Sequence, residues 1–332
     1  PEQVKTLFRN SRIIGRRFRI VHVRFGREII EVTTFRGQNS DSNQQVESDT
    51  GQLLRDNVYG DLQSDALRRD FTANALYYSA KDLAIYDYAK GMEDIKNRQL
   101  KMIGDPTTRY KEDPVRLLRA VRFAAKLGFS IEPDTQKPIC EQAHLLSHVP
   151  PARLFEEILK LFLGGYATAT YSLLRDYRLL DELFPESFRV IDNHPSYALL
   201  IDEMIANTDK RIRTDKRVTP AFVYAALLWP AMHNEFLKLT ADGAPEVDAF
   251  AQACQKTISL QLQRIMIPKR FLIPMRQIWE LQWRLPKRQG NRAQRLLEHP
   301  KFRAGYDFLL MREVAGEQLD GLGSWWNQYQ HG

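Results

Sequence analysis

With 332 residues, 43% of them hydrophobic and 27% charged, the chain has the composition of a soluble protein of two or three domains. No apolar run approaches the roughly 20 residues that cross a bilayer, which argues against a membrane-spanning helix. The net charge is +7. The two cysteines, Cys140 and Cys254, lie far apart and near no His cluster. The sequence therefore argues against a disulfide framework or a zinc site and favours the reducing cytoplasm.

The chain starts at Pro1-Glu2-Gln3, with no initiator Met and no signal-peptide pattern. Proline is favoured in the first turn of a helix because its missing N–H has no intrahelical partner there. We therefore expect a helix at the start of the chain, and further residues upstream of Pro1 in the natural protein.

The predicted elements change in type along the chain. Residues 13–35 are β-rich on both sides of Gly26-Arg27, which predicts a β-hairpin. The polar stretch 37–51 predicts a mobile loop, and residues 64–110 mix short helices and strands. From about Asp113 onward, apolar residues recur three and four positions apart, which predicts helices. The expected fold class is α+β, with a small head and an all-helical body.

Glu31 is the first candidate for chemistry. Strand alternation places it on one face with Ile29, Thr33 and Phe35. A carboxylate among such neighbours is costly to bury unless it is paired or binds a metal. The alternative is a Glu that faces water from an edge strand, and this segment alone leaves both interpretations open.

Arg68-Arg69-Asp70, with Asn74 four residues after the acid, suits phosphate and ribose recognition. Arginine offers paired donors to phosphate oxygens, and an Asn amide both donates to and accepts from hydroxyls. The alternative is an Asp70 that caps a helix beside two solvent-exposed arginines.

A helix is predicted to open at Asp113-Pro114, with Asp113 as its N-cap. Asp113, Arg116 and Arg119 follow at intervals of three and therefore project from one face. A neighbouring acceptor and donor complement the edge of a nucleobase. An intrahelical ladder of salt bridges is the alternative.

Positive charge is concentrated between Pro268 and Arg303, a segment that contains ten Lys or Arg residues and only two Glu residues. Clustered cations beside Trp279 and Trp283 are typical of polyanion binding, although a solvated helical face has the same composition. The four-residue spacing of the two tryptophans favours buried helix packing over base stacking. The candidate RNA-binding residues of this basic tail are Lys269, Arg270, Lys287, Arg288, Arg292 and Arg295.

Four segments together resemble the class II nucleotidyltransferase family, which comprises bacterial poly(A) polymerases and tRNA CCA-adding enzymes. They occur in the family's order and at its spacings. The segments are RRDFTANAL from Arg68 to Leu76, GMEDI from Gly91 to Ile95, EDPVRLLRAVRFAAKLGF from Glu112 to Phe129, and PPARLFEE from Pro150 to Glu157. The resemblance implies a polymerase-β-like head over 1–110 that is incomplete at its N-terminus, a helical neck over 111–175, and a body with the basic tail over 176–332.

The resemblance also implies roles for individual residues. Nucleotide binding falls to Arg68, Arg69, Asn74, Asp113, Arg116, Arg119 and Arg153, among which Asp113 and Arg116 read the Watson–Crick edge. Asp70 and Glu31 are the expected catalytic acids, and Glu31 is the expected metal ligand. Gly91 matches a flexible junction between head and neck, although the family usually has two glycines there.

The family's Asp-x-Asp pair, which holds two Mg²⁺ ions, is expected upstream of Pro1, so the 332 residues alone are expected to be inactive. The strand from Ile14 to Val23 and the basic tail resemble poly(A) polymerases more than CCA-adding enzymes. The implied reaction is the addition of AMP from ATP to RNA 3′ ends, with RNA-decay or RNA-chaperone proteins as further partners. A CCA-adding enzyme and a non-catalytic RNA-binding relative are the alternatives.

Overall fold

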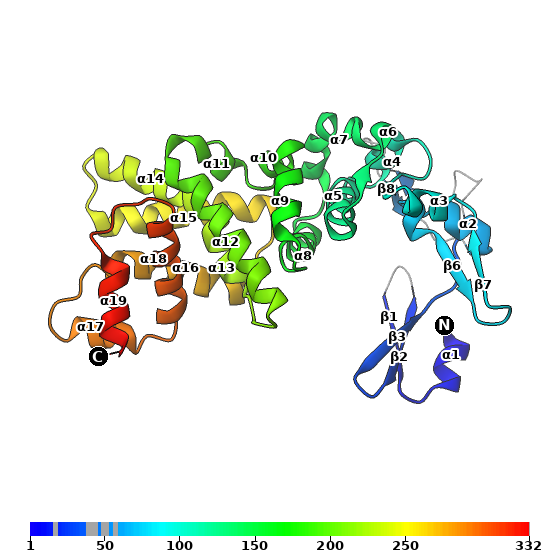
Figure 1. Cartoon of the computed structure of the whole chain (residues 1–332), viewed down its shortest axis with the longest axis horizontal. Helices are drawn as coiled ribbons and strands as arrows, with labels where there is room; N and C mark the ends of the chain where they lie inside the picture. Colours follow the sequence, from blue (N-terminus) through cyan, green and yellow to red (C-terminus); the bar gives the residue numbers. More distant parts are fainter. Residues whose placement is uncertain (16–18, 38–45, 48–52, 56–58, 332) are drawn as a thin grey trace. The chain divides into compact units, whose positions relative to one another are not determined.

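The computed structural model describes residues 1–15, 19–37, 46–47, 53–55 and 59–331. The chain divides into two compact units, labelled element by element in Figure 1. The first comprises Pro1–Arg116 and Phe129–Gln142, and the second comprises Leu117–Gly128 and Ala143–Gly332. The finer division into head, neck and body at residues 110 and 175 stays a prediction.

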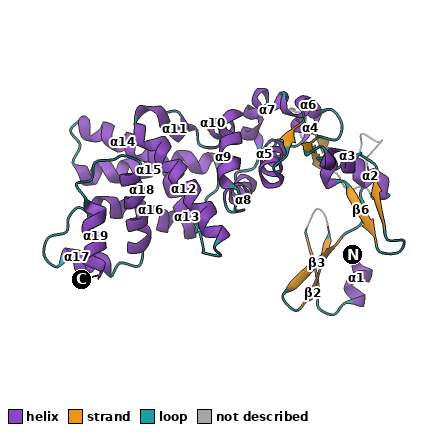
Figure 2. Cartoon of the chain, in the orientation of Figure 1, coloured by secondary structure: helices purple, strands orange, loops and turns teal. Residues whose placement is uncertain are grey.

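The strands of the described residues all belong to the first unit (Figure 2). Three of them form an antiparallel sheet in the order β1 (Ser11–Ile14), β2 (Ile20–Phe25), β3 (Glu28–Val32). The others pair as β4 (Val46–Glu47) with β5 (Leu53–Arg55), β6 (Leu76–Ser79) with β7 (Ala84–Asp87), and β8 (Gln99–Leu100) with β9 (Ser130–Ile131).

The predicted hairpin is confirmed. Phe25 lies opposite Glu28 across the turn, and Gly26 there has a φ of +60°, a conformation that glycine adopts without strain. Val21 and Val23 on the central strand are buried. Most of the predicted polar loop (38–45 and 48–51) and residues 16–18 of the strand that favours poly(A) polymerases lie outside the described residues.

Short helices fill the rest of the first unit. They are α1 (Glu2–Leu7), α2 (Leu62–Leu67), the 3₁₀ helix η1 (Thr72–Asn74), α3 (Gly91–Lys96), α4 (Pro106–Glu112), α6 (Pro133–Gln136) and α7 (Pro138–Glu141), while α5 (Val115–Leu127) begins here and continues in the second unit. Gly91 begins α3 beside η1, where an added Cβ would lie 2.3 Å from the Thr72 carbonyl oxygen. Close packing therefore requires glycine at this position.

The second unit is helical, as the apolar periodicity predicts. After α5 it contains η2 (Ala143–His148), α8 (Pro151–Phe162), α9 (Ala167–Asp176), α10 (Leu179–Leu183), α11 (Pro185–Phe188), η3 (Ile191–Asn193), α12 (Pro195–Arg213), α13 (Pro220–Leu227), α14 (Trp229–Ala241), α15 (Glu246–Arg264), α16 (Lys269–Arg284), α17 (Arg292–Leu297), α18 (Phe302–Val314) and α19 (Leu322–His331). With the mixed first unit, this confirms the α+β class with a helical body.

Trp279 and Trp283 belong to the interior packing of this unit. The Trp279 indole is fully buried and donates to the Ala225 carbonyl oxygen at 2.9 Å. The Trp283 ring packs edge-on against Phe236, with centroids 4.3 Å apart. The preference for helix packing over base stacking is thus confirmed. Within the described ranges, no helix combines the length and apolar character that crossing a membrane requires.

Candidate active site

Asp70 and Asn74 meet in the first unit. The Asp70 side chain is 8% exposed. Its Oδ1 accepts from the Phe71 backbone N–H at 2.9 Å and from the Asn74 amide at 3.1 Å. The carboxylate lies just before η1 rather than at its N-cap, which is Phe71. Local hydrogen bonds therefore fix the direction of the predicted catalytic acid.

The Arg69 guanidinium lies against Asp65 and Tyr77. Its Nη2 lies 3.0 Å from Asp65 Oδ2, and its Nε donates to the Tyr77 hydroxyl at 3.2 Å. Burial acts to raise the pKa of Asp65, but hydrogen bonds from Tyr77, from the Arg36 backbone and from Arg69 outweigh it and hold this pKa below its ordinary value. Arg69 thus has structural partners, Asp65 and Tyr77, that the sequence did not indicate. The neighbouring Arg68 is half-buried.

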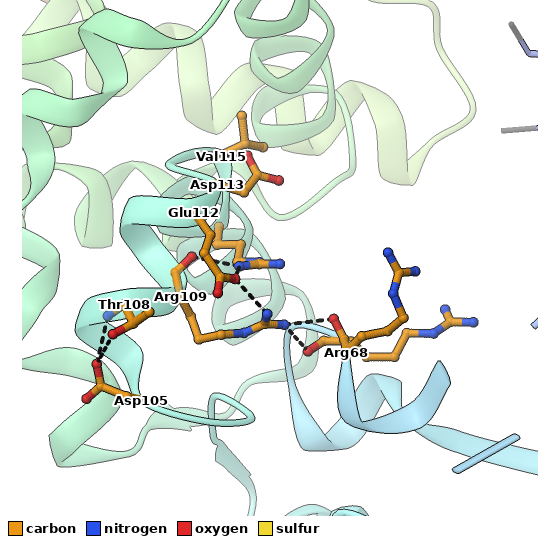
Figure 3. A network of polar contacts seen from close by, with 9 residues as sticks. Arg68, Asp105, Thr108, Arg109, Glu112, Asp113 and Val115 are labelled. Atoms are coloured by element: carbon orange, nitrogen blue, oxygen red, sulfur yellow. Dashed lines mark hydrogen bonds and ion pairs between the residues drawn. The ribbon is translucent and has the colours of Figure 1, made fainter. Parts of the chain in front are cut away.

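Arg109 joins this segment to α4. Its Nη2 donates to the backbone carbonyl oxygens of Arg68 and Arg69, both at 2.7 Å, and its Nη1 lies 2.7 Å from Glu112 Oε2 (Figure 3). Burial and the neighbouring Arg116 lower the pKa of the Arg109 guanidinium, and Glu112 opposes both effects. One partly buried cation therefore fixes the Arg68-Arg69 backbone against the carboxyl-terminal turn of α4.

Arg116 shares the same carboxylate. Its Nη1 donates to Glu112 Oε2 at 2.8 Å and to the Arg109 carbonyl oxygen at 2.7 Å. Asp113, just before it, ends α4 as C-cap, and its Oδ1 accepts from the Val115 N–H at 3.3 Å. The new helix begins at Val115, one residue later than Pro114, with Asp113 at the junction. The structure thus places Asp113 and Arg116 together and constrains both.

Two predicted nucleotide-binding residues belong to the second unit. The Arg119 guanidinium carbon lies 5.0 Å from the centre of the Phe123 ring. Arg153 is exposed in the first turn of α8. Their support of the base-reading pair stays a prediction.

Glu31 faces water from β3, with its side chain 64% exposed, and Oε1 lies 3.1 Å from His22 Nε2. An exposed carboxylate fits one oxygen ligand of a hard cation such as Mg²⁺. Within the described residues, no group of three or more His, Cys, Asp or Glu side chains could hold a metal ion. Glu31 therefore fits as a single ligand, and the described residues do not complete a metal site.

The predicted RNA-binding cations are at the surface of the second unit. Lys269 and Arg270 occupy the first turn of α16, and the Arg270 guanidinium lies 4.8 Å from the Phe271 ring centre. Lys287 is exposed, and Arg288 lies 4.9 Å from the Trp325 ring centre. Arg292 and Arg295 are exposed on α17.

Sequence reasoning missed Arg109 and the bridging role of Glu112. The spacing of Glu112, three residues from Arg109 and four from Arg116, was a visible signal for the two ion pairs. The bond from Arg109 to Arg68 spans 41 residues, so no local pattern indicated it.

Known proteins match this chain along most of its length. Residues 1–101 match the family described as poly A polymerase head domain, residues 128–189 the probable RNA and SrmB-binding site of polymerase A, and residues 242–332 the polymerase A arginine-rich C-terminus. Poly(A) polymerase I of Escherichia coli O6:H1 is 49% identical over 99% of this chain and 73% of its own length.

CCA-adding enzymes match less of the sequence. The CCA-adding enzyme of Bacillus subtilis is 36% identical over 55% of this chain and 44% of its own length. The solved structure of the Bacillus stearothermophilus CCA-adding enzyme in complex with CTP has a TM-score of 0.56 and 23% identity, and the match covers 100% of this chain and 70% of that one, which shows a shared fold. The chain belongs to the bacterial poly(A) polymerase family, polynucleotide adenylyltransferases that extend RNA 3′ ends with AMP from ATP without a template.

Proposed function

We propose that the constrained pair Asp113 and Arg116 reads the Watson–Crick edge of the incoming ATP in this reaction. The observation that carries the proposal is the Glu112 carboxylate, which lies within 2.8 Å of guanidinium nitrogens of both Arg109 and Arg116. Since Arg116 is thereby held in one orientation, its remaining donors are pre-organised for a base edge.

Adenine offers an acceptor ring nitrogen beside a donor amine on its Watson–Crick edge. Arg116 complements the acceptor, and the Asp113 carboxylate complements the amine. Cytosine offers the same order of groups, so this pair alone does not separate ATP from CTP. It rejects bases with the opposite order, because they would leave a buried donor or acceptor unpaired.

Arg68 and Arg69 are proposed to bind the triphosphate, and Asn74 the ribose. The two hydrogen bonds from Arg109 to the Arg68 and Arg69 carbonyl oxygens, here called the Arg109 clamp, fix this backbone. They thereby limit how far the two arginine side chains move relative to Arg116. Arg119 and Arg153 are proposed to support the recognition of the base.

Family membership implies ATP as substrate and the use of a divalent metal ion. We propose that Glu31 is one ligand of a two-Mg²⁺ site and that Asp70 is one of the acids of the active site. Bound Mg²⁺ supplies stabilisation of the charge on the triphosphate and on the leaving pyrophosphate. Asp70 is held in place for its part by the Phe71 N–H and Asn74.

RNA is the second substrate, and we propose that the cations of the basic tail contact its backbone. The match to an arginine-rich family segment over residues 242–332 supports this role. RNA-decay or RNA-chaperone proteins are proposed as further partners. The free thiols of Cys140 and Cys254 support a reducing cytoplasm as the location of the enzyme.

The test is nucleotide incorporation by the full-length protein on a short RNA with a free 3′-hydroxyl. We expect repeated addition of AMP from ATP and no extension with CTP alone. Addition of two CMP residues followed by one AMP would identify a CCA-adding enzyme instead. RNA binding without incorporation of any nucleotide would identify a non-catalytic relative.

A further inference from the structure

A pocket of about 790 Å³ opens in the second unit. Its walls come from α12, α13, α16 and α18 and from the segment between α12 and α13. Among these helices, α12 packs on α13, α13 on α16, α16 on α18 and α18 on α12. The lining residues between 203 and 222 lie outside all three matched family segments.

Cations dominate the polar lining of this pocket. Two acids, Glu203 and Asp307, are outnumbered by seven Lys or Arg side chains: Lys210, Arg211, Lys216, Arg217, Arg270, Lys301 and Arg303. Both acids already have partners. Glu203 accepts from the Asn207 amide at 2.7 Å, and Asp307 Oδ1 lies 3.0 Å from Arg303 Nε. The excess positive charge is therefore not neutralised from within.

Several of these cations form no ion pair with an Asp or Glu among the described residues. In the part of the chain that the structure describes, no ion pair or hydrogen bond engages the Lys210, Lys216 or Lys301 ammonium or the Arg217 guanidinium. Arg211 instead donates from Nε and Nη2 to the Arg217 carbonyl oxygen, at 3.3 and 3.1 Å, and the Lys216 N–H donates to the Arg211 carbonyl oxygen at 2.8 Å. The loop that carries Lys216 and Arg217 is thus tied to the end of α12.

Apart from Asn207, Thr208, Thr214 and Thr219, the remainder of the lining is apolar. Phe222 packs edge-on against Phe308, with centroids 6.0 Å apart, and Val314 is 67% exposed although it lines the pocket. Met204, Phe271, Pro274, Ile278 and Leu310 extend this apolar surface. Such a surface suits the flat face of a nucleobase, which every base presents.

We propose that this pocket binds one nucleotide unit of single-stranded RNA, with its base on the apolar surface and its flanking phosphates on the surrounding cations. The proposal rests on RNA as the substrate. The pocket shares Arg270, Lys301 and Arg303 with the basic tail and adds Lys210, Arg211, Lys216 and Arg217, which lie outside it. Cations come from the α12–α13 loop and from Lys301 and Arg303 of another segment. Positive charge from separate segments suits a chain with a phosphate on each side of the base.

The experiment measures binding of a fluorescently labelled oligo(A) to this chain by anisotropy, from 50 to 200 mM salt. Lys216→Glu is compared with Lys238→Glu, an exposed lysine on α14 that does not line the pocket. We expect Lys216→Glu to weaken binding several-fold and to lower the slope of log K against log salt by about 0.7, the value for one phosphate contact. Lys238→Glu should leave both values unchanged. Val314→Asn, a neutral change on the exposed rim, should weaken binding by roughly 3-fold and leave the salt slope unchanged, because the base loses apolar contact.

Equal effects of Lys216→Glu and Lys238→Glu would overturn the proposal, since general charge would then explain binding. Displacement of oligo(A) by free AMP or by poly-glutamate at matched phosphate or carboxylate concentration would assign the pocket to a mononucleotide or to an acidic protein instead. The readout is binding without nucleotide addition. A full-length protein that binds oligo(A) through Lys216 but incorporates no AMP would refute the proposed function and leave the pocket assignment standing.

Discussion

The Arg109 guanidinium donates to the Arg68 backbone carbonyl oxygen at 2.7 Å, across 41 residues of sequence. This bond connects the segment proposed to bind ribose and triphosphate with the helix that precedes the base-reading pair. Since the same guanidinium also lies 2.7 Å from Glu112, the two parts of the proposed ATP site share one partly buried cation.

Arg109→Lys should destabilise the chain by about 1–3 kcal/mol, because a lysine ammonium cannot reach both carbonyl oxygens and Glu112 with the geometry of a planar fork. Urea unfolding of the chain measures this loss. Arg189→Lys is the control, since Arg189 is exposed and pairs with Glu186 at the surface, and it should change stability by less than about 0.5 kcal/mol. Similar losses in both variants would mean that the Arg109 clamp contributes little.

Arg116→Ala should reduce the preference of the full-length protein for ATP over GTP and UTP, because the donors to the base edge disappear. One good bidentate base contact is worth about 1–3 kcal/mol, or roughly 5- to 150-fold in discrimination. The ratio of kcat/KM values for the nucleotides measures it. Arg122→Ala, on the same helix, should leave the ratio unchanged. Wild-type discrimination in Arg116→Ala would remove Arg116 from the site.

Asp70→Asn and Glu31→Gln should each lower AMP addition by about 10- to 100-fold while RNA binding stays at the wild-type level, because their proposed roles concern metal and nucleotide. Asp70→Asn keeps an oxygen to accept from the Phe71 N–H, so the local fold should survive. Incorporation and RNA affinity are measured on the same preparations. A parallel loss of both, with a lower Tm, would show a structural role.

Reversing Lys287, Arg288, Arg292 and Arg295 to Glu should raise the KM for RNA and leave that for ATP nearly unchanged. A tail that contacts roughly four phosphates loses about 50-fold in affinity between 50 and 200 mM salt, and the reversed protein should lose much less. A salt titration of RNA binding compares the two proteins. Parallel slopes would place the RNA elsewhere on the molecule.

The chain should become less stable as the pH falls, because the folded state disfavours protonation of His233. Burial lowers the pKa of His233 to about 4, with Arg312 and His194 acting in the same direction and Glu317 opposing them. The ring also lies between Trp229 and Phe236, and its Nδ1 is 3.1 Å from the Tyr197 hydroxyl.

Because the unfolded chain binds this proton more readily, stability is lost as the pH falls from about 6.5 towards 4, by up to about 3 kcal/mol. His233→Gln should therefore show a smaller fall in Tm between pH 7 and pH 5 than the parent. The exposed His148→Gln is the control and should follow the parent. An unchanged pH dependence in His233→Gln would show that other groups cause the loss.

The sequence by itself determined the local structure of this protein. Gly26 between two β-rich runs was enough to predict the β2–β3 hairpin, and apolar spacing was enough to predict the helical second unit. The four-residue spacing of Trp279 and Trp283 likewise predicted their packing. These features depend on backbone preferences and on burial of one face of a helix or strand, and residues close together in the sequence determine both.

Only the tertiary structure decided which polar groups meet. The sequence paired Arg68 with Arg69 as phosphate ligands, whereas folding brings Arg69 to Asp65 and Tyr77 and places Arg109 on the backbone of both. Likewise, the basic segment was visible in the sequence, but the pocket between α12 and α18 was not. A long charged side chain reaches several ångströms in any direction, so its partners depend on how distant segments pack rather than on the residues beside it.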